Sequence, residues 1–279
     1  LYYCTNTAQV GGLLFPAGVR LCYRSLDGGM AWDAGRVLLQ KPASHFPQCQ
    51  GVGEQFDSLD GYYPTADAQG RLYLIIRCGP TTESIGVDAP PSTAYVLRSD
   101  DEMATWHQVG VAPALPTGYG LAGKGPFKEE LRADHDGNLY LVRGTQGPSD
   151  GLYLTVSGDR GVTWTAPRKM LVPGTHLAAS PTWQVAVGSP GHAAVAYAGS
   201  SSAPPCAPSS SSCGDLSMYL VETSNALSPA PVFRGAALNG PGDRTAYQLA
   251  GKDFTDVTIG PDAVARAVFP GGYVGWLGR

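Results

Sequence analysis

The sequence predicts an all-β fold, a β-propeller built of four-stranded antiparallel blades. Three observations predict it: many glycines and prolines between short apolar segments, a Ser-x-Asp turn motif that recurs, and a strand–turn–strand motif that recurs in step with it. This profile is typical of short strands joined by turns. A four-stranded sheet cannot bury both of its faces alone, so neighbouring sheets must stack around an axis.

The Ser-x-Asp motif is the clearest repeated element. It is intact in "SLDGGMAW" (25–32) and "SGDRGVTW" (157–164), whereas "SDDEMATW" (99–106) has methionine in place of glycine. Ser224 and Asn225 mark a decayed fourth copy without the tryptophan. Ser and Asp side chains accept backbone hydrogen bonds in tight turns, Gly permits positive φ, and Trp anchors the turn by packing. The residues assigned to these structural turns are Ser25, Asp27, Gly29, Trp32, Ser99, Asp101, Trp106, Ser157, Asp159, Gly161 and Trp164.

The strand–turn–strand motif gives the division into blades. Its four copies cover residues 66–77, 133–143, 186–198 and 259–269, and each of the first three precedes a Ser-x-Asp motif. The chain is therefore expected to form one propeller domain. We expect full blades at about 46–115, 116–175 and 176–245, with partial blades at 1–45 and 250–279, so the ring is incomplete or closed by other means.

Composition narrows the classes of function. Only 15% of the residues are charged and the net charge is −4, which argues against nucleic acid as a partner because that requires a basic face. No apolar run approaches the ~20 residues of a membrane helix, so no membrane span is expected. The first residues read as the middle of a strand and no signal peptide is evident, which predicts a mature or trimmed piece.

The six cysteines are even in number and locally spaced. We predict three disulfides in a secreted protein: Cys4–Cys22, Cys49–Cys78 and Cys206–Cys213. The alternative is six free or metal-bound thiols. Because the sequence has no C-x-x-C pattern and no Cys/His cluster, we expect neither a metal site nor a cofactor.

The turn motifs resemble the Asp-boxes, or BNR repeats, of the sialidase superfamily. Segments such as "CYRSLDGG" and "DFTDVTIGP" are also similar to secreted bacterial sialidase-like proteins, and the resemblance covers nearly the whole chain. It implies six blades when the ring is complete and a glycan or glycoconjugate as partner. It also implies that the boxes lie at the outer rim, away from the substrate, where they are structural. A calcium site is the alternative there, but the carboxylates are few and widely spread.

The four inner strands are expected at residues 62–67, 129–134, 183–188 and 255–260. Alternation along them separates a mostly apolar set from a polar set that faces the axis. A glycosidase needs two carboxyl groups, or a nucleophile with a carboxylate base. The polar set supplies the candidate catalytic residues Glu130, Asp256 and Tyr63 and the candidate substrate-binding residues Arg132 and Gln184. In type they resemble the Tyr–Glu pair, the acid and the carboxylate-gripping arginines of sialidases.

Two hypotheses about function remain open. The Arg-Ile-Pro motif of sialidases is absent, and Glu130–Arg132 is equally consistent with an ion pair between blades. The first hypothesis is a secreted sialidase-like glycoside hydrolase that acts at the axial mouth of the propeller. The second is a non-catalytic propeller module that binds a glycan or a protein partner, within a larger assembly. Fold alone does not decide between them.

Overall fold

The structure of the chain is a computed structural model, and all regular secondary structure in its described part is β-strand. The described residues are 1–6, 19–40, 64–78, 93–115, 129–145, 151–177, 183–201, 216–239, 255–269 and 273–277. The strands form five antiparallel sheets, numbered here from the first to the fifth in chain order.

Three or four consecutive strands make up most of the sheets. The first contains β1 (Tyr2–Asn6), β2 (Val19–Arg24) and β3 (Arg36–Gln40); the second contains β4 (Thr65–Ala66), β5 (Leu72–Cys78), β6 (Thr93–Ser99) and β7 (His107–Val111). The third contains β8 (Glu129–Ala133), β9 (Leu139–Thr145), β10 (Gly151–Ser157) and β11 (Arg168–Lys169). The fourth contains β12 (His176–Leu177), β13 (Trp183–Val187), β14 (Ala193–Ser200), β15 (Leu216–Thr223) and β16 (Arg234–Ala237), with β12 and β13 both paired to β14. The fifth contains β17 (Asp256–Ile259), β18 (Ala265–Phe269) and β19 (Tyr273–Trp276).

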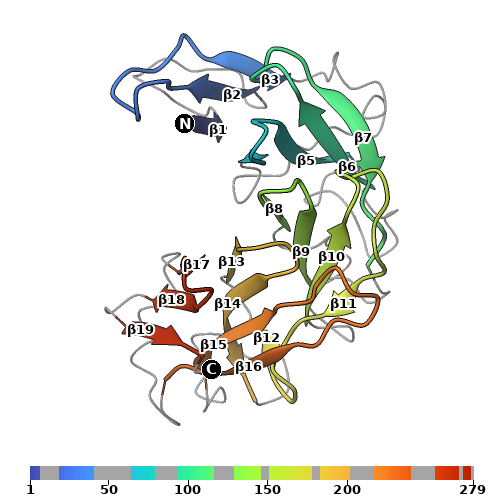
Figure 1. Ribbon diagram of the computed structural model, residues 1–279, viewed down its shortest axis with the longest axis vertical. Coiled ribbons are helices and arrows are strands. Elements are labelled where there is room, and N and C mark those ends of the chain that lie inside the picture. The colour runs from blue at the N-terminus through green and yellow to red at the C-terminus, as the bar shows by residue number, and fades with distance from the viewer. Residues whose placement is uncertain are drawn as a thin grey trace, which may run out of the picture.

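The five sheets stand side by side along an arc, with β8, β13 and β17 on its inner side (Figure 1). Strand β8 contacts β4 of the second sheet and β13 of the fourth, and β13 contacts β17 of the fifth. The inner strands β4, β8, β13 and β17 of four successive sheets thus line up, in the order that the sequence repeat predicts. Because this row is where the polar set was expected, it fixes the place to look for a functional site.

The hydrophobic core lies between the sheets. Leu131 and Ala133 of β8 are buried against Tyr73 and Ile75 of the second sheet. In the same way Trp183 and Val185 of β13 pack on Tyr140 and Val142, and Val257 of β17 packs on alanines of β14. One face of each inner strand therefore covers the preceding sheet. This is the apolar half of the alternation expected from the sequence.

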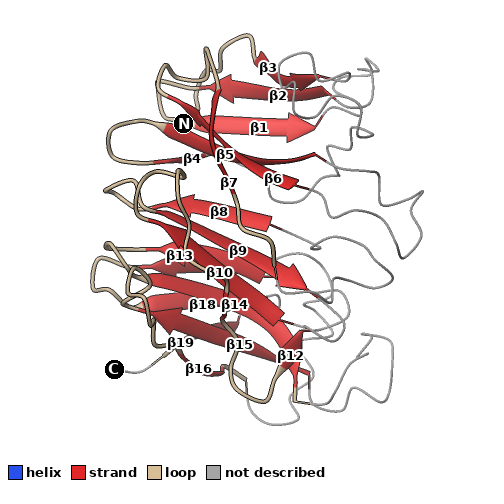
Figure 2. Cartoon of the chain, turned by 90° about the vertical axis from the view of Figure 1, so that its right-hand side faces the viewer, coloured by secondary structure: helices blue, strands red, loops and turns tan. Residues whose placement is uncertain are grey.

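The two ends of the sheets differ. The turns that join β4 to β5, β6 to β7, β8 to β9 and β10 to β11 lie together at one end, which we call the turn end (Figure 2). The inner strands β8, β13 and β17 begin at the opposite end, which we call the strand-start end. Glu129, Trp183 and Asp256 are therefore nearer to the strand-start end than to the turns.

The Ser-x-Asp turns carry the hydrogen bonds expected of them. Ser157 Oγ accepts from Gly161 N (2.7 Å) and donates to Asp159 (2.8 Å), and Asp159 accepts from Thr163 N (2.8 Å). The turns at Ser25 and Ser99 repeat this pattern. The residue that donates to the serine has positive φ in each: 98° at Gly29, 71° at Met103 and 93° at Gly161.

The fourth copy is shifted by one residue from the register that the sequence predicted. Thr223, and not Ser224, takes the place of the serine: its Oγ1 donates to Asn225 Oδ1 (2.9 Å). Asn225 Oδ1 accepts from Val232 N, seven residues on, whereas the other three turns close after four. Glu222, the residue before Thr223, is paired with Arg234, just as Val156, the residue before Ser157, accepts from Thr165 N. Arg234 therefore corresponds to Thr165, and Phe233 corresponds to Trp164. The copy has therefore gained three residues and kept an aromatic anchor.

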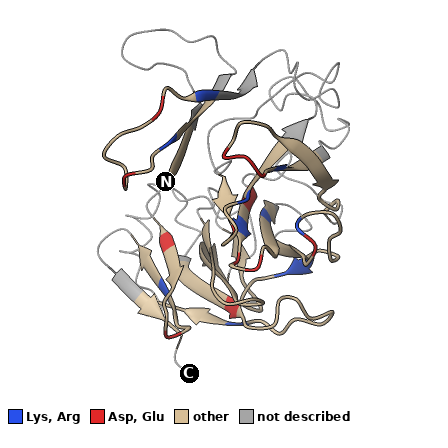
Figure 3. Cartoon of the chain, turned by 45° about the horizontal axis from the view of Figure 1, so that its top comes forward, with Lys and Arg blue, Asp and Glu red and all other residues tan. Residues whose placement is uncertain are grey.

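Cysteine and charge placement complete the fold. Cys4 and Cys22 form a disulfide between β1 and β2, as predicted. The predicted Cys49–Cys78 and Cys206–Cys213 pairs depend on side chains outside the described residues. Charged residues of both signs are distributed over the sheets (Figure 3). Among the described residues, no helix has the length and hydropathy of a membrane span.

Candidate functional site

Glu130 and Arg132 meet on β8, on the side that faces the fourth sheet. Glu130 is only 2% exposed, and its Oε1 pairs with Arg132 Nη2 and accepts a hydrogen bond from Val185 N (3.2 Å). Arg132 Nε in turn donates to Val185 O (3.2 Å). The two side chains thus hold β8 against β13 through hydrogen bonds to the backbone of Val185. The ion pair itself lies within β8, and its two hydrogen bonds to Val185 connect the third sheet to the fourth, so it differs from the ion pair between blades that was the alternative expected from the sequence.

Asp256 has different surroundings. Its side chain is exposed on β17, and its Oδ1 accepts from Val257 N (2.8 Å) of the same strand. Thr258 is exposed on the same face, whereas Val257 is buried on the other. Asp256 is therefore a solvent-facing carboxylate on an inner strand. It belongs to the fifth sheet, so β13 stands between it and the Glu130–Arg132 pair.

Of the two remaining predicted site residues, Gln184 and Tyr63, the structure describes only Gln184. Gln184 is partly exposed on β13, between the strands of Glu130 and Asp256. Tyr63 lies outside the described residues. The structure thus brings Glu130 and Arg132 into contact, and it places Gln184 and Asp256 on the next two inner strands. Within the described part of the chain, no three His, Cys, Asp or Glu side chains gather in a way that could hold a metal ion.

Sequence reasoning missed a pair of buried acid–tyrosine contacts at the turn end. Asp67 accepts from Tyr73 OH (2.8 Å) and from Arg71 Nε (2.6 Å), and Asp134 accepts from Tyr140 OH (2.8 Å). Both lie in the strand–turn–strand motif, where the sequences "ADAQGRLY" and "ADHDGNLY" share the Asp and the Tyr at the same spacing. That shared spacing was the available signal.

These contacts shift the ionisation of both partners. Burial alone would raise the pKa of Asp67, but the hydrogen bonds from Arg71 and Tyr73 outweigh it and lower the pKa below its usual value. Burial, helped by the hydrogen bond to Asp67, raises the pKa of Tyr73 to about 12. Tyr73 is fully buried, so the pair stabilises a turn and is not a nucleophile within reach of a substrate.

The fourth sheet replaces this arrangement with another one. Gly188 stands where Asp67 and Asp134 stand, and His192 follows it at the position of Arg71. His192 Nε2 instead lies 3.3 Å from Glu222 Oε2, and Arg234 Nε donates to Glu222 Oε1 (2.7 Å). The buried Glu222 is thus held by side chains from two neighbouring strand ends. The loss of the motif at Gly188 removed any signal for this cluster from the sequence.

The fold has counterparts among solved structures. A protein of unknown function from Dyadobacter fermentans aligns over 99% of this chain and 65% of its own, with 16% identity and a TM-score of 0.52. The NanB sialidase from Streptococcus pneumoniae aligns over 92% and 33%, with 16% identity and a TM-score of 0.53. The intramolecular trans-sialidase from Ruminococcus gnavus aligns over 92% and 46%, with 14% identity and a TM-score of 0.51.

These matches establish the architecture. The chain spans between 33% and 65% of the length of these three proteins. It has the antiparallel β-propeller type of fold found in sialidases, which are glycoside hydrolases. The sequence itself matches no protein-family model, and no curated protein is significantly similar to it.

Proposed function

We propose that this chain is a secreted glycoside hydrolase of the sialidase type that acts on a glycan at the inner side of the arc. The observation that carries the proposal is the exposed Asp256 carboxylate, on an inner strand of a fold shared with sialidases. Asp256 would serve as the acid that protonates the leaving oxygen, and Tyr63 as a nucleophile. Glycan binding there needs polar groups aimed at the substrate, which the partly exposed Gln184 supplies.

Arg132 and Glu130 take separate roles in this proposal. Arg132 keeps 30% of its side chain exposed, and its three guanidinium nitrogens contact Glu130, Val185 O and Leu131 O. Each terminal nitrogen has a second N–H, and these two N–H groups are suited to the carboxylate of an anionic substrate. Glu130 is better placed to hold Arg132 than to attack a sugar, since its carboxylate is buried and bonded on Oε1.

The second candidate is a non-catalytic module that binds a glycan or a protein partner. The burial of Glu130 favours it, because one of the two expected catalytic carboxylates is engaged in holding two sheets together. Six blades, the predicted Cys49–Cys78 and Cys206–Cys213 disulfides and the resemblance of the turns to Asp-boxes are part of both candidates. Membership of a larger assembly is part of the second.

A release assay separates the two candidates. The protein is incubated with aryl-glycosides, including sialosides, and the freed phenol is measured for the wild type, Asp256→Asn and Asp262→Asn. Asp262 is the matched control, an acidic residue of the same sheet that pairs with Arg266 at the turn between β17 and β18. We expect Asp256→Asn to lower turnover by about 100-fold or more and Asp262→Asn to leave it unchanged. Equal turnover by the wild type and both variants would overturn the assignment of Asp256 as the catalytic acid. If the wild type binds a glycan but turns over no substrate, the result would favour the binding module.

A further inference from the structure

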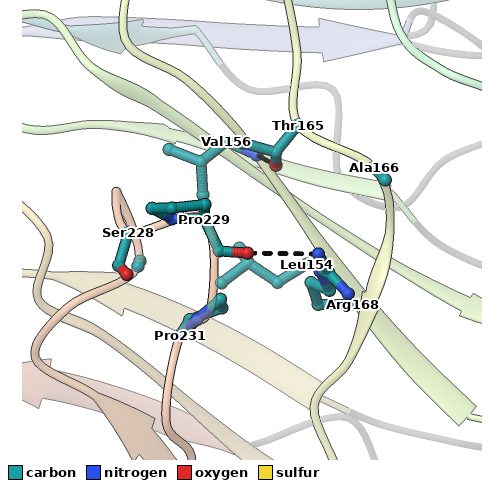
Figure 4. Close-up of a pocket in the computed structure, with 9 residues that line it drawn as sticks. Leu154, Val156, Thr165, Ala166, Arg168, Ser228, Pro229 and Pro231 are labelled. Carbon is teal, nitrogen blue, oxygen red and sulfur yellow. Dashed lines mark hydrogen bonds between the residues drawn. The ribbon is translucent and has the colours of Figure 1, made fainter.

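The seam between the third and fourth sheets holds a pocket that is separate from the inner strands. It has a volume of about 240 Å³ and opens to solvent. Its lining comes from strand β10, from the segment that leads into β11, and from the turn between β15 and β16 (Figure 4). The lining residues include Leu154, Val156, Thr165, Arg168, Ser228 and Pro229.

The pocket is built by the irregular fourth turn. In that turn, Asn225 Oδ1 accepts from the N–H of Val232, seven residues later. In the turn at Ser157, Asp159 Oδ1 accepts from the N–H of Thr163, four residues later, so the fourth turn is longer by three residues. Ser228 and Pro229, which lie in this longer stretch, form one wall, and Leu154 and Val156 of the third sheet form the facing wall (Figure 4). The extra residues therefore create a concavity where the regular repeat would place a compact turn.

The polar side chains of the pocket are two hydroxyls and one guanidinium, and each retains a hydrogen-bond donor. Thr165 Oγ1 accepts from Val156 N (2.9 Å), and Ser228 Oγ accepts from Ala230 N (3.2 Å). Arg168 Nη2 donates to Pro229 O (3.1 Å), which holds the guanidinium at the mouth, and its other N–H groups have no acceptor among the described residues. None of the described residues that line the pocket is acidic. The lining is thus apolar inside, with free donors and one positive charge at the rim.

This combination selects a ligand chemistry. An exposed guanidinium with free N–H groups binds a carboxylate in a bidentate manner. In the part of the chain that the structure describes, the apolar walls have no aromatic ring on which a sugar could stack, and the volume lies below the roughly 300–1,000 Å³ of sites for drug-sized ligands. We propose that this pocket binds a branched aliphatic group next to a carboxylate, as in an N-acylated leucine or the C-terminal leucine of a peptide. Neither the pocket nor its ligand depends on glycoside hydrolysis at Asp256.

Matched ligands test the proposal. N-acetyl-L-leucine and N-acetyl-L-leucinamide have the same aliphatic group, but only the first has a carboxylate. Binding is followed by methyl NMR of Leu154 and Val156, and we expect saturation by the acid with a dissociation constant of about 1 mM, weakened at least about fivefold for the amide. A peptide that ends in leucine separates the sources: tighter binding than the free acid assigns the pocket to peptide C-termini, and equal binding assigns it to the small acid.

Three variants locate the site on the surface without disturbing the core. Arg168→Gln removes the charge and Ala166→Phe fills the mouth, and both residues are exposed. Lys169→Gln is the control, because it removes the neighbouring exposed cation, which does not line the pocket. We expect both pocket variants to weaken the acid at least fivefold and the control to bind as the wild type does. Equal binding of acid and amide, an unaffected Arg168→Gln, or no saturable shift would each overturn the proposal.

Discussion

At the scale of single residues, most of the buried charges hold the backbone in place. Glu130 pairs with Arg132 of its own strand and joins two sheets by accepting from Val185 N, and Asp67 and Asp134 each close a turn with a tyrosine. Asp256 is the exception among the predicted inner-strand acids, since it faces solvent. The distinction matters because a structural carboxylate and a catalytic one respond differently to the same substitution.

Glu130→Gln tests the structural role directly. The amide can still accept from Val185 N, but it loses the charge that pairs with Arg132. Because Arg132 is partly exposed, we expect a loss of about 1–3 kcal/mol in the free energy of unfolding, less than for a fully buried pair. Urea denaturation measures it, with Asp136→Asn, an exposed acid at the turn of the same sheet, as a control within about 0.5 kcal/mol of wild type. A fully stable Glu130→Gln protein would contradict the role.

Tyr73 should make stability sensitive to alkali. The pKa of Tyr73 is raised to about 12 in the folded protein by burial and by Asp67, whereas an unfolded tyrosine ionises near its ordinary value of 10.0. Between these values only the unfolded state releases the proton, so rising pH weakens the fold, by up to about 1.4 kcal/mol per pH unit for this group. The contribution of the Tyr73 hydroxyl to the free energy of unfolding is fully present below pH ~10 and is lost as the pH rises toward the pKa of the folded state.

Tyr73→Phe removes that contribution. At pH 8 the variant lacks the hydrogen bond to Asp67 and should be less stable by about 1–2 kcal/mol. At pH 11 the difference should narrow by about 1 kcal/mol, because only the wild type loses stability through this tyrosine. Urea unfolding at both pH values measures the two gaps, and a gap that stays constant would refute the assignment.

At the scale of elements, the Ser-x-Asp turns are the repeated unit. Each uses one hydroxyl to accept a backbone N–H and one carboxylate or amide to accept another further along the turn. The same chemistry survives in the fourth turn, although three residues have been added and threonine replaces serine. The turn therefore needs the hydrogen-bonding side chains at its start, and it tolerates extra residues before the N–H that closes it.

The register of the fourth turn can be checked by a pair of substitutions. Thr223→Val removes the hydroxyl that bonds to both Asn225 Oδ1 and Asn225 N, and we expect a loss of about 1 kcal/mol in unfolding free energy. Ser224→Ala changes an exposed neighbour and should stay within about 0.5 kcal/mol of wild type. Thermal or urea unfolding compares them. The reverse order of effects would restore the register first expected from the sequence.

At the scale of the whole molecule, stability depends on the seams between sheets. Two of these seams combine an apolar cluster with a hydrogen bond across the sheets: Ala133 N donates to Thr65 Oγ1 (2.9 Å) between the second and third sheets, and Gly191 N donates to Tyr140 OH (2.6 Å) between the third and fourth. At the seam of the third and fourth sheets, the fully buried indole of Trp183 lies against Gly144. The glycine leaves the space that this ring occupies.

Gly144→Ala should therefore loosen that seam. A Cβ at this position would lie 2.8 Å from Trp183 Cζ3, so either the ring or the strand must move. Overpacking of this kind costs about 1–3 kcal/mol, which chemical denaturation can measure. Gly158→Ala is the control: its Cβ would meet nothing nearer than Asn138 Oδ1 at 3.8 Å, and its φ is not positive. Equal stability of the two variants would show that the seam tolerates the extra atom.

The sequence by itself determined the all-β class, the order of the inner strands and the chemistry of the turns. Those features are local: alternation, glycine at positive φ and a Ser-x-Asp pair act within a few residues, so a repeated pattern reports them directly. The one-residue error at Ser224 arose because an insertion changed the spacing that carried the pattern. Only the tertiary structure decided that Glu130 is buried against β13 while Asp256 faces solvent, and only it revealed the pocket beside Arg168. These properties depend on which residue of a neighbouring sheet lies opposite. A contact between residues 55 positions apart, such as Glu130 and Val185, leaves no local signature in the sequence.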